Sequence, residues 1–281
     1  ENYENELWVT DGSTSSSGIT TMMPSISATT DNGNPRTFTL DSDGFFFEAT
    51  TETYGEELWF SDGTVSGTHI VKDICTGTCG TIGEMIIFDN LLYFSANNGI
   101  NGSELWRSDG TETGTYMVND SSSGTTSASP SKFCIFDNML YYNGYGLGGN
   151  EMWRSDGTES GTEKFYDFSS YTISGNPDHL IVMGNEMFFE AYDLTNGKEL
   201  WKTDGTTSGT VMVKDINSGS SSSFLESVVI FGSKLYFEAS DGVNGKELWT
   251  SDGTNAGTEM VIVINSGSAN GYAYHLFLQN R

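Results

Sequence analysis

Short apolar runs separated by polar turns recur along the whole chain, and one stretch shows the pattern clearly. Residues 227–231, Ser-Val-Val-Ile-Phe, are mostly apolar and β-branched, Gly232-Ser233 follows, and residues 235–239, Leu-Tyr-Phe-Glu-Ala, form a second strand. Two such runs joined by two small residues indicate a tight β-hairpin, because Gly, Asn and Asp tolerate positive φ. Residues 247–251 and 258–263 continue as a third and a fourth strand around a polar turn. The pattern therefore predicts a four-stranded unit.

This unit repeats, and each copy carries one tryptophan in the phrase Glu-Leu-Trp, followed by an Asp-Gly pair; Met152 replaces the leucine in one copy. Successive tryptophans are 51, 47, 47, 48 and 48 residues apart. A fixed period of this size is typical of solenoids and β-propellers. We expect all six tryptophans to pack in the core. They are Trp8, Trp59, Trp106, Trp153, Trp201 and Trp249.

Three short links and one longer connector join the four strands of each period, which is the order found in a β-propeller blade. Residues 228–231 are apolar without alternation, as expected for a strand buried on both faces. The Leu and Trp of each motif point to opposite faces of the third strand, so each can pack on a different neighbouring blade. The sequence predicts an all-β protein, with a single six-bladed β-propeller domain over residues 1–281.

The first strand of the period occurs six times and the second strand only five times. The sequence starts just before a third strand and ends just after a first strand. We therefore expect a composite terminal blade made of residues 1–26 and 265–281 that lacks one strand. A gap in a sheet leaves unpaired backbone groups. Three resolutions are open: a strand from a partner fills the gap, the sequence is a fragment of a longer chain, or the array of sheets is open rather than ringed. We favour a partner strand, either from a copy of this chain or from another extracellular protein.

The phrase ELWFSDGT at residues 57–64 is followed by Gly67-Thr68, and the same pattern returns in four later copies. In this phrase the chain resembles the ELWxxDGT repeat family, and the resemblance covers nearly the whole sequence. The first copy departs from the family pattern, with Gly18-Ile19 at the end of a Ser/Thr-rich loop. The resemblance implies a secreted or cell-surface protein with a propeller-like fold. It implies no reaction, substrate or catalytic residue.

Each repeat also carries two acidic residues at fixed places. An Asp in an Asp-Gly turn bonds its own backbone, and we expect this role for the repeat aspartates. The chain has 38 acidic and 12 basic side chains, so most repeat glutamates have no basic partner. We expect each Glu to accept backbone or Thr hydroxyl hydrogen bonds or to lie at a hydrated rim, with a cation site as the alternative. The aspartates are Asp11, Asp62, Asp109, Asp156, Asp204 and Asp252; the glutamates are Glu6, Glu57, Glu104, Glu151, Glu199 and Glu247.

The formal net charge of −26 speaks against a nucleic-acid partner, because phosphate binding needs clustered Lys and Arg. No apolar run approaches the roughly 20 residues of a membrane-spanning helix. The opening residues, Glu-Asn-Tyr-Glu, suit a processed secreted protein. We expect the protein outside the cell or on its surface.

Residues that carry catalytic chemistry are sparse. The three histidines, His69, His179 and His275, occupy unrelated repeat positions. No zinc-ligand spacing, nucleophile elbow or phosphate-binding loop occurs. The sequence therefore predicts no enzyme activity. The Gly-rich loops hold oxygen ligands that suit Ca²⁺, although none has EF-hand spacing and turn chemistry explains them equally well. Apart from this candidate Ca²⁺ we expect no cofactor; its candidate ligands are Asp241, Asn244, Asp193, Asp41 and Asp43.

Two further features suit a secreted protein. Cys75 and Cys79 lie in one connector and are a candidate disulfide, which leaves Cys134 as a buried free thiol. Asn101 and Asn119 begin N-glycosylation triplets.

These observations predict an extracellular, non-enzymatic structural or adhesive glycoprotein that assembles with itself, for example into filaments, through its incomplete blade. The alternative is a propeller module that binds glycans or Ca²⁺. A third hypothesis is an enzyme that acts on polysaccharide, which needs only two suitably placed carboxylates.

Overall fold

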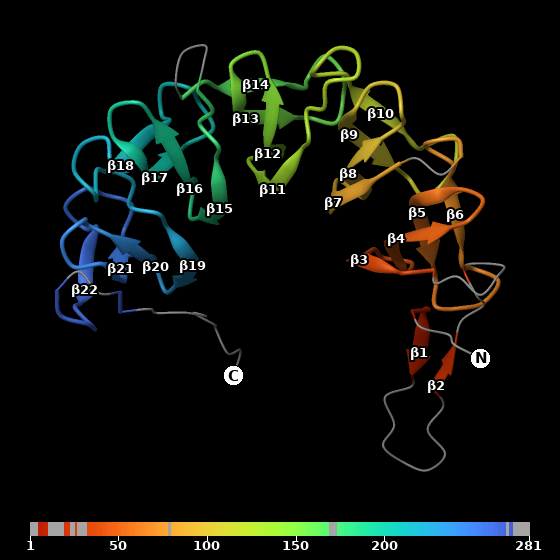
Figure 1. The fold of residues 1–281 in the computed structure, drawn as a ribbon, viewed down its shortest axis with the longest axis horizontal. Helices are drawn as coiled ribbons and strands as arrows, with labels where there is room; N and C mark the ends of the chain where they lie inside the picture. The colour runs from red at the N-terminus through yellow and green to blue at the C-terminus, as the bar shows by residue number, and fades with distance from the viewer. Residues whose placement is uncertain are drawn as a thin grey trace. The chain divides into compact units, whose positions relative to one another are not determined.

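The chain folds entirely into β-structure. The structure, a computed structural model, describes residues 5–10, 20–22, 26, 33–77, 80–168, 173–267 and 270–271. These residues form twenty-two strands, and no helix among them is long and apolar enough to cross a membrane. The chain divides into two compact units, Glu1–Ser131 with Gly157–Glu159 and Lys132–Asp156 with Ser160–Arg281. The expectation of an all-β protein is confirmed (Figure 1).

The first unit contains one two-stranded and two four-stranded sheets, all antiparallel. Their strands are β1 (Trp8–Thr10) and β2 (Thr20–Met22); β3 (Arg36–Leu40), β4 (Phe45–Thr51), β5 (Gly55–Ser61) and β6 (His69–Lys72); and β7 (Ile82–Phe88), β8 (Leu91–Asn97), β9 (Ser103–Ser108) and β10 (Tyr116–Asn119).

The second unit contains three four-stranded sheets. Their strands are β11 (Ser131–Phe136), β12 (Met139–Gly146), β13 (Gly149–Ser155) and β14 (Glu163–Tyr166); β15 (Asp178–Met183), β16 (Glu186–Asp193), β17 (Gly197–Thr203) and β18 (Val211–Lys214); and β19 (Glu226–Phe231), β20 (Lys234–Ser240), β21 (Lys246–Ser251) and β22 (Glu259–Ile262). In all five four-stranded sheets the strands lie in chain order, as in a propeller blade.

Two-residue turns join the first and second strands of the four sheets from β7 to β22. Asp89 and Asn90 have φ of 51° and 58°, and Asp137 and Asn138 have φ of 46° and 60°. Positive φ at both central residues gives the twist that suits a two-residue hairpin. The hairpins expected from the Asp-Asn pairs are therefore confirmed.

Neighbouring sheets bury apolar faces against each other. In the first unit, Leu58 and Val71 of sheet β3–β6 share a core cluster with Phe94 and Trp106 of sheet β7–β10. Trp106 thus faces the preceding sheet, and Leu58 faces the following one. Contacts of this kind explain why the apolar runs do not alternate.

The second unit shows both directions of packing at one motif. Leu200 belongs to the cluster that contains Phe237 and Trp249 of the following sheet. The adjacent Trp201 belongs to the cluster that contains Phe165 of the preceding sheet. The expectation that the Leu and Trp of a motif pack on different neighbours is confirmed, and a β-bulge lies between these two residues.

The tryptophans do not all lie in the core. Trp106, Trp201 and Trp249 are buried, and Trp59 and Trp153 are half-buried. Trp8 is 54% exposed, which differs from the expectation. Its sheet has only two described strands, and the opposite face of that sheet, with Leu7, packs on the next sheet. The face that carries Trp8 therefore lacks a neighbour among the described residues.

A candidate binding pocket between two neighbouring sheets

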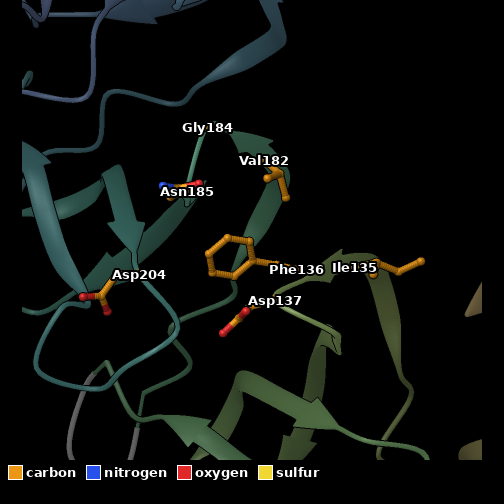
Figure 2. Close-up of a pocket in the computed structure, with 7 residues that line it drawn as sticks. All are labelled: Ile135, Phe136, Asp137, Val182, Gly184, Asn185 and Asp204. Atoms are coloured by element: carbon orange, nitrogen blue, oxygen red, sulfur yellow. The ribbon is translucent and has the colours of Figure 1, made fainter. Parts of the chain in front are cut away.

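A cavity of about 410 Å³ opens between sheets β11–β14 and β15–β18 of the second unit. It lies where three turns meet: the turn after β11, the turn after β15 and the turn after β17. Figure 2 shows the side chains that line it. The lining residues are Ile135, Phe136, Asp137, Val182, Gly184, Asn185 and Asp204.

The base of the pocket is apolar. Phe136 is only 7% exposed, and its ring centroid lies 6.0 Å from that of Tyr141. In Figure 2 the Phe136 ring occupies the middle of the pocket, with Val182 on one side of it. Phe136 ends strand β11, so the strand fixes the ring while the following turn leaves one side of it accessible.

Two carboxylates border this apolar base. Asp137 occupies the first position of the turn after β11 and is exposed. A Cβ placed on Gly205 would lie 3.7 Å from Oδ2 of Asp137 and 3.6 Å from Cε1 of Phe136. The turn that begins with Asp204 therefore lies directly beside both side chains.

The Asp204 carboxylate is held in place by its own turn. Its Oδ1 accepts hydrogen bonds from the backbone N–H of Thr206 (2.9 Å) and from Oγ1 of Thr206 (2.6 Å). The Thr206 hydroxyl and N–H hold the pKa of Asp204 below its ordinary value. Asp204 is therefore a fixed negative charge at neutral pH.

The basic side chains near the pocket are engaged elsewhere. Arg154 Nη2 lies 2.6 Å from Glu163 Oε1, and Lys202 Nζ lies 2.8 Å from Glu186 Oε1, so both form their ion pairs with glutamates outside the pocket. Arg154 Nη1 also lies 3.4 Å from the carbonyl oxygen of Gly205, next to Asp204. Within the described part of the chain, no ion pair includes Asp137 or Asp204. The pocket thus combines an apolar base with two negative charges that no basic side chain pairs with, which suits a cationic ligand group.

The lining of the pocket differs from the corresponding place at the next pair of sheets. At the next pair of sheets in the same unit, Gly184 occupies the place of Asp137, and Ser233 occupies the place of Asn185. The Asp-Gly turn itself is common to the repeats, so Asp137 is the residue that sets this pocket apart from its neighbour. Sequence analysis missed the pocket, and its signal in the sequence is weak, because Asp89 occupies the place of Asp137 in sheet β7–β10.

The repeat glutamates have a structural role. Glu57 accepts backbone hydrogen bonds from Ile74 and Cys75, both at 2.9 Å, and Glu199 accepts them from Ile216 (2.9 Å) and Asn217 (3.2 Å). The expectation of backbone hydrogen bonds is confirmed. Each bond fixes the connector to the next sheet. Corresponding backbone bonds are accepted by Glu6, Glu104, Glu151 and Glu247.

Burial shifts the acidity of these glutamates. Desolvation raises the pKa of three of them to about 7, although the backbone hydrogen bonds act in the opposite direction. Burial also raises the pKa of Glu151. The three with a pKa of about 7 are Glu57, Glu104 and Glu199.

The repeat aspartates close the turn after each third strand. Asp62 Oδ1, for example, accepts hydrogen bonds from the N–H and the hydroxyl of Thr64. Asp109 and Asp252 bond their turns in the same way. A Cβ on Gly161 would meet the Asp156 carboxylate, which therefore lies over its own turn. Asp11 lies outside the described residues.

The candidate calcium ligands hold their own loops. Asp241 Oδ1 accepts hydrogen bonds from the N–H groups of Val243 and Asn244 (2.9 and 2.8 Å). Asp193 makes equivalent bonds to Thr195 and Asn196. Asp41 and Asp43 lie in the turn between β3 and β4. Among the residues described here, no three His, Cys, Asp or Glu side chains are grouped to hold a metal.

The cysteines and the glycosylation candidates are partly placed. Cys75 is disulfide-bonded, and its pairing with Cys79 stays a prediction because Cys79 lies outside the described residues. Cys134 is a free thiol and is half-buried. Asn101 donates through Nδ2 to Asp120, and Asn119 Nδ2 lies 3.5 Å from a backbone oxygen.

Two histidines lie in the described part of the chain. His69 Nδ1 is 3.3 Å from the Gly67 carbonyl oxygen, and His179 Nδ1 is 3.9 Å from Asp178 Oδ1. His275 lies outside the described residues.

Comparison with known proteins gives structural matches only. No family model and no curated protein matches the sequence. Among solved structures, a puromycin hydrolase has a TM-score of 0.54 at 10% identity, covering 94% of this chain and 42% of that chain. A structure from a study of two prolyl endopeptidases has a TM-score of 0.52 at 13% identity, covering 81% and 36%. A puromycin-hydrolyzing peptidase of Mycobacterium tuberculosis has a TM-score of 0.52 at 10% identity, covering 82% and 37%.

These matches support the β-propeller fold. The chain spans about two fifths of the length of the hydrolase and peptidases that it matches. At this identity the likeness concerns the fold alone, and one fold hosts many functions.

The predicted function is wrong. The structural matches are to a hydrolase and peptidases, which contradicts a self-assembling structural subunit and gives no support to the glycan, Ca²⁺ or polysaccharide alternatives. The error arose because repeat symmetry and an incomplete terminal sheet are properties of the scaffold. One scaffold hosts many functions, so these two properties do not determine what the protein does.

Proposed function

We propose that this chain is the β-propeller module of a peptidase-type protein and that it binds basic peptides. The matched proteins are a hydrolase and peptidases of which the chain covers only part, which supports a module that accompanies a catalytic domain. In this proposal the module holds the peptide, and the reaction takes place on the other domain.

The pocket between sheets β11–β14 and β15–β18 carries the proposal. Its volume of about 410 Å³ is in the range of small ligand sites and suits one or two amino-acid side chains. The aliphatic stem of a lysine or arginine would lie on the Phe136 ring, where cation–π attraction adds to apolar contact. The charged end would reach Asp137 and Asp204.

The charge of the whole chain supports the same ligand class. A net charge of −26 attracts cationic peptides over long range and repels acidic ones. Within the pocket, the exposed amide of Asn185 can bond a peptide backbone group without adding charge.

We also propose that the fold has six blades. The sixth copy of the motif lies in β1, and residues 1–26 and 265–281 would together form the terminal blade. Its support is the sixfold sequence period. A location outside the cell likewise stays a proposal, which the family resemblance supports.

A peptide-binding assay tests the function. Four fluorescent peptides of equal length would carry Lys, Arg, norleucine or Glu at one central position, and their anisotropy would be measured with the full chain. We expect the Lys and Arg peptides to bind most tightly and the Glu peptide least. If none of the four binds to the folded chain, the proposed function is wrong.

One substitution locates the binding site. Asp137→Asn should weaken binding of the Lys peptide by about tenfold, the loss of one charged hydrogen bond of about 1.5 kcal/mol. The matched control is Asp89→Asn, which changes the first residue of an equivalent positive-φ turn in the other unit. The control should leave the affinity unchanged. Equal losses in both variants would place the binding elsewhere.

A further inference from the structure

Arg154 of β13 reaches from its own sheet to the turn that carries Asp204. Its Nη1 donates to the carbonyl oxygen of Gly205 at 3.4 Å. Gly205 directly follows Asp204, and a Cβ placed on it would lie 3.6 Å from Cε1 of Phe136. This contact therefore joins sheets β11–β14 and β15–β18 at the wall of the pocket.

The Arg154 guanidinium is itself held by three further side chains of its own sheet. Its Nε and Nη2 donate to Oε1 of Glu163 at 3.0 and 2.6 Å, and its Cζ lies 5.0 Å from the centroid of the Phe165 ring. Tyr141 is opposite Arg154 in the strand register and is 1% exposed. Burial raises the pKa of Tyr141, and its hydrogen bond with Arg154 opposes this shift. These contacts fix the planar guanidinium in one orientation.

The Asp204 turn is closed by its own hydrogen bonds. The N–H of Gly205 donates to Oγ1 of Thr203 at 3.1 Å. Oδ1 of Asp204 accepts the N–H and the hydroxyl of Thr206 at 2.9 and 2.6 Å. Because the carboxylate is bonded to its own turn, a donor that holds the Gly205 carbonyl also holds the Asp204 carboxylate in place.

The same arrangement occurs once more among the four-stranded sheets that the structure describes. Tyr93 is opposite Arg107 in sheet β7–β10, and Nη1 of Arg107 donates to the Gly157 carbonyl at 3.0 Å. Arg107 and Gly157 both belong to the first unit. The other three sheets lack a Tyr–Arg pair; the residues at these places are Phe46 and Phe60, Phe188 and Lys202, and Tyr236 and Thr250. Arg107 is therefore a matched control for Arg154.

We propose that Arg154 is a positioning residue of the pocket, which holds the Asp204 turn beside Phe136 and places the carboxylate within reach of a cationic side chain. Its effect on the ligand rests on the proposed peptide binding. A hydrogen bond to a carboxylate weakens steeply when its geometry is lost, whereas apolar contact with the Phe136 ring does not depend on the carboxylate. Displacement of the turn should therefore penalise a charged ligand more than an apolar one.

Arg154→Lys tests position separately from charge. Lysine keeps the positive charge beside the pocket, but its ammonium lacks the planar fork that contacts Glu163 and the turn together. Tyr141→Phe is a milder second variant, because Phe46 and Phe188 occupy the same place in other sheets. It decides the test if Arg154→Lys does not fold.

Hydrogen exchange of the full chain, measured by NMR without peptide, tests the support of the turn. Arg154→Lys should accelerate exchange of the Thr206 N–H, which is bonded to Asp204, by about fivefold, in the range of one lost hydrogen bond. Tyr141→Phe should act in the same direction by a smaller factor. Arg107→Lys should leave the Thr206 N–H unchanged. An unchanged Thr206 N–H in folded Arg154→Lys, or equal acceleration in Arg107→Lys, would overturn the proposal.

Peptide anisotropy tests the effect on selectivity. Arg154→Lys should weaken binding of the Lys peptide by about threefold, a part of one charged hydrogen bond, and leave binding of the norleucine peptide nearly unchanged. Arg107→Lys should change neither. Equal losses for the two peptides in Arg154→Lys would refute the role in selectivity. If the unmodified chain binds no peptide, the proposed function is wrong, and exchange of the Thr206 N–H still decides whether Arg154 holds the turn.

Discussion

The repeat glutamate shows how one residue type can serve the same purpose many times. Its carboxylate is buried beside the third strand and accepts the N–H groups of the connector that leads to the next sheet, as Glu199 does with Ile216 and Asn217. Connectors have few strand partners for their backbone groups, and such groups must be bonded when buried. The glutamate therefore ties each sheet to the start of the next one.

Removal of one such carboxylate should destabilise the fold. Glu199→Ala leaves two N–H groups unbonded and should lower the free energy of unfolding by about 3 kcal/mol. Glu259→Ala, at an exposed position on β22, is the control and should change it by less than about 0.5 kcal/mol. Urea denaturation of the variants measures both. A small effect of Glu199→Ala would show that water or other groups replace the carboxylate.

The same glutamates set a pH dependence of stability. Because the pKa of Glu57, Glu104 and Glu199 is about 7 in the folded chain against an ordinary 4.5, the folded state holds protons that the unfolded state has released. The free energy of unfolding should therefore fall as pH rises from about 4.5 to 7 and level off above that. Glu199→Gln should make this slope shallower. A slope identical to that of the unmodified chain would contradict the raised pKa of Glu199.

At the scale of the element, the turn after each third strand is built from side-chain hydrogen bonds. In the last sheet, Asp252 accepts the N–H and hydroxyl of Thr254, and the Thr254 hydroxyl in turn accepts the N–H of Gly257 at 2.9 Å. The Asp252 carboxylate lies so close to Gly257 that a Cβ there would collide with it. The Gly of each Gly-Thr pair is thus required by close approach.

An added methyl group should open this turn. Gly257→Ala forces the Asp252 carboxylate away from its donors and should cost about 1–2 kcal/mol of stability, roughly one lost hydrogen-bonded contact with local strain. Ala256→Ser, one residue earlier and exposed, already has a Cβ and should be near neutral. Thermal unfolding of both variants gives the comparison. Equal midpoints would mean that the turn adapts without loss.

The sequence was informative about elements and less so about what surrounds them. The repeated motifs located the strands and hairpins, because short apolar runs and two-residue Asp-Asn turns are local features of the sequence. The burial of Trp8 was not predictable, since it depends on which sheet covers that face. The pocket at Phe136 and Asp137 was missed because it needs two sheets and three turns brought together.

At the scale of the whole molecule, charge is the dominant global property. The 38 acidic and 12 basic side chains leave a net charge of −26, and the described ion pairs use only a few of the acids. Like charges at this density repel one another and weaken the compact state. Salt should relieve the repulsion.

The thermal midpoint at neutral pH should therefore rise when NaCl is increased from about 10 mM to about 0.5 M, over which the screening length falls well below the spacing of surface charges. A neutral osmolyte at the same osmolality is the control, because it is excluded from the protein surface but does not screen charges. A midpoint that falls with salt would show that favourable ion pairs outweigh the repulsion.

The function could not be predicted from the repeat. Near-identical repeats suggested a passive structural array, whereas structural matches to a hydrolase and peptidases contradict that account. The proposed peptide binding instead relies on a position that differs between neighbouring repeats, Asp137, in whose place the next repeat has Gly184.

Chemical-shift mapping by NMR tests the peptide-binding account most directly. Titration of the isotopically labelled full chain with the Lys peptide should shift the signals of Phe136, Asp137, Gly184 and Asn185 first and most strongly. The norleucine peptide should produce smaller shifts at the same residues. Saturable shifts confined to other turns, with these four signals unmoved, would contradict the account.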